Sequence, residues 1–219
     1  MNMSRKRIII LIFVGVLLLV GVTTAVLAWE GATRQPWENS HDVKKPAVYL
    51  YPETDLQVQV HLDVDGELTV TEPDYGDGWE VLVSEDGLID GQYDYLFYEM
   101  RLKSLTLPDS GWIVEYSQLE PWFDVNLGLL GLNPYEAAEF KEYWLGKLPQ
   151  SAYYEVKLLT TDFLEDHMTL EIDPQPDTII RLIFCFSPLS QATYIDEPEV
   201  VTPIRKGFTV VEWGGILEQ

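Results

Sequence analysis

The sequence predicts an α+β domain, mainly antiparallel β in the form of a sandwich or a partly open barrel, with a helical pair inserted in its middle. Three observations predict this class. Short runs of alternating apolar and polar residues recur both before and after the middle of the chain, separated by turn residues. Residues 117–148 instead carry apolar residues at helical spacing. An uncharged N-terminal run predicts one transmembrane or signal helix ahead of the domain.

The N-terminal region divides into a basic tail, an apolar segment and a tether. Residues 1–7 include the cluster Arg5-Lys6-Arg7, and residues 8–28 carry no charge. About 20 apolar residues span a bilayer, and basic flanks stay cytoplasmic. We therefore expect residues 8–28 to be a single-pass membrane anchor that places the following residues on the outer side. The alternative is a signal peptide cleaved near Ala28, which would give a secreted protein. Residues 29–42 read as a tether, and residues 43–219 as an exported acidic domain.

The predicted strands combine alternation with β-branched and aromatic residues. They cover residues 47–51, 57–64, 67–71, 79–83, 93–100, 112–116, 152–159, 168–172, 178–186 and 208–213. Asp65-Gly66 separates the second run from the third. A two-residue Asp-Gly connection between alternating runs predicts a β-hairpin, because both of its central residues need positive φ.

Two helices are predicted in the middle of the chain. Asn133 can cap a helix whose first residue is Pro134 and whose Glu136 completes a capping box. Phe140 and Trp144 then recur at helical spacing. A preceding helix is expected within residues 117–131.

The charge balance restricts the classes of partner. The chain has 36 acidic and 14 basic residues, a formal net charge of -22. Such a surface repels the phosphates of nucleic acids and anionic lipid headgroups, so we expect no nucleic-acid partner. A cation, a neutral polymer or a basic protein remains compatible, and the charge also fits a role in solubility alone. The single cysteine, Cys185, lies in an apolar run and is expected to be a buried thiol.

Calcium is the one cofactor for which the sequence offers ligands. Acidic residues cluster in two neighbouring turns: Asp63, Asp65, Glu67, Asp74 and Asp77. Oxygen ligands of this kind suit calcium. The spacing does not match an EF-hand, however, and Asp and Gly also occur in tight turns for backbone reasons alone.

The candidate ligand-binding residues are Tyr93, Tyr95, Phe97 and Glu99, which share one face of a predicted strand. An aromatic row that ends in a carboxylate suits carbohydrate, because rings stack on sugar faces and a carboxylate accepts hydrogen bonds from hydroxyls. The alternative is an aromatic core strand whose Glu99 pairs with a base such as Arg101.

Glu99 is also the candidate catalytic residue. A glycosidase needs a general acid and a second carboxylate roughly 5–9 Å away. Asp94 would point to the other face of the strand, which leaves Glu53 or Glu212 as the partner. The chain contains no G-x-S-x-G motif, no glycine-rich phosphate loop and no paired cysteines for zinc.

The segment KPAVYLYPE at residues 45–53 resembles the opening motif of an uncharacterised bacterial family of exported proteins. The ending GFTVVEWGG at residues 207–215 and the segment YLFYE at residues 95–99 are similar to that family as well, although Tyr98 stands where the pattern has Trp. The resemblance covers residues 43–215. It implies domain limits and an exported location, but no activity and no catalytic residues.

The sequence therefore favours a membrane-tethered, non-catalytic binding module for an envelope component, either a glycan or a protein. Two alternatives stay open. One is a carboxylate-dependent hydrolase that acts on glycans with Glu99 as general acid. The other is a structural or assembly protein of the cell envelope.

Overall fold

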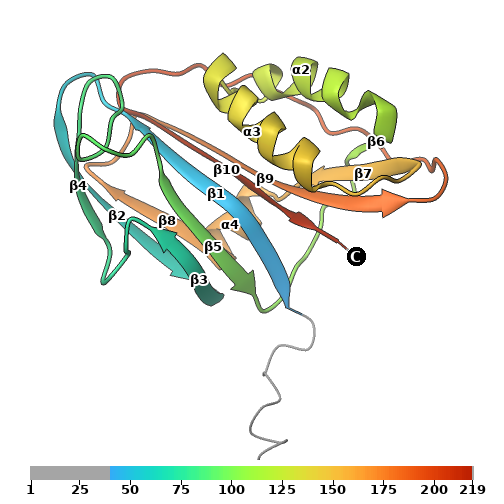
Figure 1. Cartoon of the computed structure of the whole chain (residues 1–219), viewed down its shortest axis with the longest axis horizontal. Coiled ribbons are helices and arrows are strands. Elements are labelled where there is room, and N and C mark those ends of the chain that lie inside the picture. Colours follow the sequence, from blue (N-terminus) through green and yellow to red (C-terminus); the bar gives the residue numbers. More distant parts are fainter. Residues whose placement is uncertain (1–39, 219) are drawn as a thin grey trace, which may run out of the picture. The chain divides into compact units, whose positions relative to one another are not determined.

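Ten strands and three α-helices make up most of residues 40–218, the part of the chain that the computed structural model describes (Figure 1). The predicted basic tail, the anchor or signal segment 8–28 and residues 29–39 of the tether lie outside these residues. Among the described residues, no helix is both long enough and apolar enough to cross a membrane.

The larger sheet has seven strands in the spatial order β3-β5-β1-β10-β9-β7-β6. The strands are His41–Tyr51 (β1), Gly66–Glu72 (β3), Leu96–Leu102 (β5), Trp112–Glu115 (β6), Tyr153–Leu158 (β7), Thr178–Leu189 (β9) and Thr209–Leu217 (β10). Neighbours are antiparallel except β9 and β10, which run parallel. The first and last strands of the described chain are therefore adjacent in the middle of this sheet.

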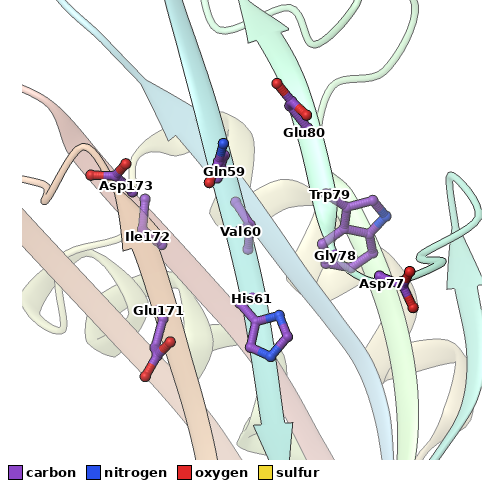
Figure 2. Close-up of a pocket in the computed structure, with 10 residues that line it drawn as sticks. All are labelled: Gln59, Val60, His61, Asp77, Gly78, Trp79, Glu80, Glu171, Ile172 and Asp173. Atoms are coloured by element: carbon purple, nitrogen blue, oxygen red, sulfur yellow. The ribbon is translucent and has the colours of Figure 1, made fainter.

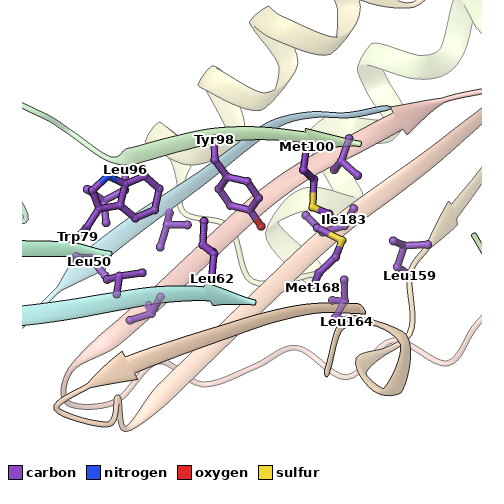
Figure 3. Packing of buried hydrophobic residues seen from close by; sticks show 14 of the residues in the cluster. Leu50, Leu62, Trp79, Leu96, Tyr98, Met100, Leu159, Leu164, Met168 and Ile183 are labelled. Carbon is purple, nitrogen blue, oxygen red and sulfur yellow. The ribbon is translucent and has the colours of Figure 1, made fainter. Parts of the chain in front are cut away.

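A smaller sheet packs against one face of the larger one. Its order is β4-β2-β8, from Leu56–Val64 (β2), Trp79–Val83 (β4) and Met168–Asp173 (β8). Apolar side chains from both sheets and from helix α4 (Thr161–His167) fill the space between them (Figure 3). We call this cluster the inter-sheet core; it includes Leu50, Leu62, Trp79, Tyr98, Met100, Leu164, Met168 and Ile183.

Two helices cover the opposite face of the larger sheet (Figure 1): α2 (Leu119–Leu129) and α3 (Pro134–Lys147). Their buried residues form a second, aromatic-rich cluster with the sheet, which we call the helix–sheet core. The centroid of the Phe140 ring lies 4.9 Å from that of Phe184, and the Trp144 ring lies 4.8 Å from Phe186. Each large side chain buried in this way contributes roughly 1.5–3 kcal/mol to folding.

The alternation along β1 explains how one sheet serves two cores. Val48 and Leu50 point into the inter-sheet core, whereas Ala47 and Tyr49 point into the helix–sheet core. Because successive side chains of a strand point to opposite faces, β1 is buried on both sides. Its continuous run of buried residues therefore belongs to a central strand of a three-layer domain.

The predicted start of α3 is confirmed. The Asn133 side chain accepts a hydrogen bond from the backbone N–H of Glu136, and Glu136 accepts one from the backbone N–H of Asn133. The preceding helix is found within its predicted range. The α+β class with mainly antiparallel strands is confirmed too, and both sheets are open rather than closed into a barrel.

The predicted hairpin at Asp65-Gly66 is wrong. The strands on either side of this dipeptide belong to different sheets, since β2 pairs with β4 and β8 while β3 pairs with β5. Gly66 does not have positive φ. A Cβ atom there would lie 2.0 Å from the backbone oxygen of Arg101, so glycine is needed for close approach of two backbones. The dipeptide carries the chain from one sheet to the other.

Other boundaries differ locally. His41 and Asp42, expected in the tether, already belong to β1 and pair with Leu102 and Arg101. Helix α4 was not expected, although Thr160 caps it by accepting a hydrogen bond from the backbone N–H of Phe163. Cys185 is buried as expected, and its burial, reinforced by the charge of Glu218, raises the pKa of its thiol to about 12.

Candidate functional site

Three of the four predicted ligand-binding residues line one cavity. Tyr93, Tyr95 and Phe97 border a space of about 290 Å³ near the start of β5. Four polar or charged residues complete its lining: Lys45, Glu72, Gln92 and Asp94. We call this space the aromatic cavity.

Different backbone elements position these three rings. Tyr93 lies in the loop before β5, where its backbone N–H donates to the oxygen of Ile89 at 2.9 Å and its own oxygen accepts from the Ile89 N–H at 2.8 Å. Tyr95 immediately precedes β5, which begins at Leu96 rather than at residue 93 as predicted. Phe97 lies within β5 opposite Glu72 of β3, which brings that carboxylate to the cavity.

Lys45 reaches the cavity because β1 is irregular beside it. The pairing of β1 with both neighbouring strands shifts between residues 43 and 47, and Lys45 has a φ of 57°. The Nζ of Lys45 donates a 2.5 Å hydrogen bond to the hydroxyl of Tyr95 and lies 4.2 Å and 5.0 Å from the ring centroids of Tyr95 and Phe97. The ammonium group therefore covers part of the aromatic surface, so a ligand must pack beside it or displace it.

Glu99, the fourth predicted residue, lies outside the cavity lining. Its carboxylate accepts a 3.0 Å hydrogen bond from the Nζ of Lys44, which is also 3.5 Å from Asp42. The expected partner Arg101 pairs instead with Asp42 and Glu67. Glu99 therefore contacts Lys44 and is not among the residues that would touch a ligand in the cavity.

The carboxylates proposed to assist Glu99 lie elsewhere. Glu212 points into the inter-sheet core, where it bonds to Tyr98, and Glu99 points to the other face of the same sheet. Glu53 is an exposed residue of the connection between β1 and β2. The sheet separates Glu212 from Glu99, so these two residues do not form a glycosidase pair.

A buried tyrosine lies behind the aromatic cavity. The ring of Tyr49 is 5.1 Å from that of Tyr95 and 6.3 Å from that of Tyr135. Tyr49 is 1% exposed, and its hydroxyl has no hydrogen-bond partner among the described residues. Burial, reinforced by the nearby Tyr95 and Glu139, raises the pKa of Tyr49. Its phenol is therefore a neutral donor without an acceptor.

The residues predicted to bind calcium do not form one cluster. Asp65 pairs with Lys103 at 2.8 Å and with His167 at 3.5 Å. Glu67 pairs with Arg101 at 3.6 Å, and Asp77 borders a separate groove. Within residues 40–218, no group of three or more His, Cys, Asp or Glu side chains is arranged to hold a metal ion. Calcium binding by the acidic turns that carry Asp63, Asp65, Glu67, Asp74 and Asp77 stays a prediction.

Compared with protein-family models, curated proteins and solved structures, the chain has no significant match in any of the three.

Proposed function

We propose that residues 43–219 form a non-catalytic module that binds a glycan of the cell envelope in the aromatic cavity. Residues 8–28 would hold the module at the outer side of the membrane. The observation that carries the proposal is the lining of one cavity by Tyr93, Tyr95 and Phe97 together with four hydrogen-bonding side chains.

The chemistry of this lining suits a neutral sugar. Aromatic rings offer apolar faces, while Lys45 donates hydrogen bonds, Glu72 and Asp94 accept them, and Gln92 does both. Ligand sites commonly combine an apolar surface with a few placed polar groups in this way. The volume of about 290 Å³ suits a short segment of a polymer. The net charge of -22 disfavours a polyanionic glycan.

The non-catalytic assignment rests on the carboxylates. Glu99 pairs with Lys44, and Glu212 is on the opposite face of the sheet. Glu72 and Asp94 are exposed at the cavity without an ion pair among the described residues. They serve as acceptors for hydroxyls in the proposal.

Calorimetric titration of the full chain in detergent tests the proposal. The probes are oligomers of N-acetylglucosamine and a purified bacterial cell-wall polysaccharide. Tyr95→Ala should weaken binding at least about fivefold, since it removes an aromatic contact worth about 1 kcal/mol. Gln92→Ala alters an exposed side chain and should weaken binding without affecting the fold.

Tyr194→Ala is the matched control, because Tyr194 is 85% exposed and distant in sequence from the cavity residues. It should bind both probes as the unaltered chain does. Failure of the unaltered chain to bind either probe would contradict the proposal, as would equal binding by all three variants. The appearance of shortened glycan products would contradict the non-catalytic assignment.

A further inference from the structure

The outer face of the three-stranded sheet is hollowed into a groove of about 560 Å³ (Figure 2). Gln59, Val60 and His61 of β2 run along its middle. The groove shares no lining residue with the aromatic cavity. It is therefore a second surface that the proposed glycan site does not use.

Carboxylates flank the groove on both sides of β2. Glu80 of β4 and Asp173 of β8 lie directly across from Gln59 on its two sides, and Glu171 of β8 pairs with His61. Adjacent strands are about 4.8 Å apart, so the β4 and β8 backbones that carry these carboxylates are roughly 10 Å apart across the sheet. Asp77 adds a carboxylate on the β4 side (Figure 2).

The groove carboxylates are not neutralised by any ion pair within residues 40–218. Asp77, Glu80, Glu171 and Asp173 form no ion pair with any described residue, whereas other exposed carboxylates such as Glu67 and Asp124 do. Like charges that face one another without compensation repel. A partner that brings positive charge would therefore gain Coulomb energy without breaking an existing pair.

We propose that this groove binds an extended, Lys/Arg-rich segment of a protein partner. An extended chain laid along β2 directs successive side chains to alternate sides, toward β4 and toward β8. Its side chains on one side repeat every two residues, about 6.7 Å, which is also the spacing of Glu171 and Asp173 along β8. The charge and the repeat of such a segment both match the groove.

Other occupants fit the groove less well. A sugar would need an exposed ring, but Trp79, the aromatic residue that lines the groove, is only 3% exposed, and its indole N–H donates to the backbone oxygen of Pro73. A metal ion would need a cluster of ligands, and residues 40–218 contain no such group. A basic polypeptide is the occupant that the charges favour.

Fluorescence anisotropy with a labelled oligolysine peptide and the full chain in detergent tests this inference. The double variant Glu80→Gln/Glu171→Gln removes one carboxylate from each side of β2. It should weaken peptide binding roughly threefold or more, because the peptide loses one close ion pair on each side of β2. The double variant Glu120→Gln/Glu142→Gln is the matched control, since it makes the same change in net charge on exposed residues of α2 and α3.

Peptide sequence supplies an independent comparison. A peptide of consecutive lysines should bind more tightly than one with the same number of lysines alternating with serine, because only the first contacts both sides of the groove. Equal weakening by the two double variants would overturn the inference and assign the binding to the overall charge. The absence of binding at low salt would overturn it as well. Competition for the groove by calcium or by N-acetylglucosamine oligomers, but not by unlabelled oligolysine, would assign the groove to another ligand.

Discussion

The hydroxyl of Tyr98 donates a 2.6 Å hydrogen bond to Oε1 of Glu212, a carboxylate with no exposure to solvent. The second oxygen of Glu212 accepts a 2.7 Å bond from Nε of Arg181, whose Nη2 donates to the backbone oxygen of Met168 at 2.6 Å. Burial, reinforced by the charge of Glu212, raises the pKa of Tyr98, so its phenol stays a donor. Because Met168 belongs to β8, this group of residues connects the two sheets through the inter-sheet core.

Removing the cation from this group should destabilise the domain severely. Arg181→Met leaves Glu212 as a buried charge without a counterion, and we expect the free energy of unfolding to fall by about 3–5 kcal/mol. Tyr98→Phe removes a hydrogen bond to a charged group and should cost about 1.5–3 kcal/mol. Urea denaturation of the full chain in detergent measures both. A smaller loss in Arg181→Met than in Tyr98→Phe would contradict the structural assignment.

The unpartnered hydroxyl of Tyr49 predicts an unusual response to Tyr→Phe. Tyr49→Phe removes a buried donor that has no acceptor, so it should leave the free energy of unfolding unchanged or raise it by up to about 2 kcal/mol. Tyr154→Phe is the matched control, since Tyr154 is equally buried but donates to the backbone oxygen of Pro149 at 2.6 Å. The control should lose about 1 kcal/mol. Thermal unfolding compares the two, and destabilisation by Tyr49→Phe would show that its hydroxyl has a partner.

Two glycine substitutions should act in opposite directions. Gly66→Ala places a methyl group against the backbone of Arg101 and should destabilise the domain by several kcal/mol, since the contact of 2.0 Å requires a backbone shift. Gly146→Ala meets nothing within 4 Å and lies in α3, where alanine is the better helix former. It should stabilise the domain by up to about 1 kcal/mol. Tolerance of Gly66→Ala would argue against the close approach of the β3 and β5 backbones at this position.

The ion pair of Asp65 predicts a pH dependence. The hydrogen bond from Lys103, with a further contribution from His167, lowers the pKa of Asp65 in the folded state. An unfolded aspartate titrates near pH 4. The stabilisation is therefore present above about pH 4 and is lost as the pH falls through the lowered folded value.

Asp65→Asn should accordingly flatten the acid side of the stability curve, and Asp74→Asn, which changes an exposed aspartate with no ion pair, should not. Unfolding midpoints measured as a function of pH compare the two variants with the unaltered chain. An identical acid dependence in Asp65→Asn and the unaltered chain would contradict the role of the pair.

Local sequence patterns located most of the strands and helices, apart from α4, but failed for the pairing of the strands. Alternation located β2 and β3 because it depends on residues that are neighbours in the chain. It could not show that these strands enter different sheets, because their partners β8 and β5 are distant in sequence. The capping box of α3 was predictable because it involves only residues 133–136.

The same limit applies to the candidate site. Tyr95 and Phe97 could be assigned to one face from their spacing alone. Lys45 joins them only through the irregularity in β1, and Glu72 joins them through the register of β3 against β5. The contact between Tyr98 and Glu212 spans 114 positions of the chain and leaves no local signal.

The adjacency of β1 and β10 constrains the order in which the domain can assemble. The chain is synthesised from its N-terminus, but β1 needs the final strand as its neighbour, with Val48 opposite Glu212 and Ala47 opposite Trp213. Until residues 209–217 emerge, β1 has only β5 and β9 has only β7 as a neighbour, and both cores stay incomplete. Bringing β1 and β10 together is expected to be slow, because the chain between them loses conformational entropy before the contacts between the two strands stabilise the fold. A chain that ended before β10 would thus lose the middle of its larger sheet, and a fusion to its C-terminus would have to follow Leu217 rather than replace it.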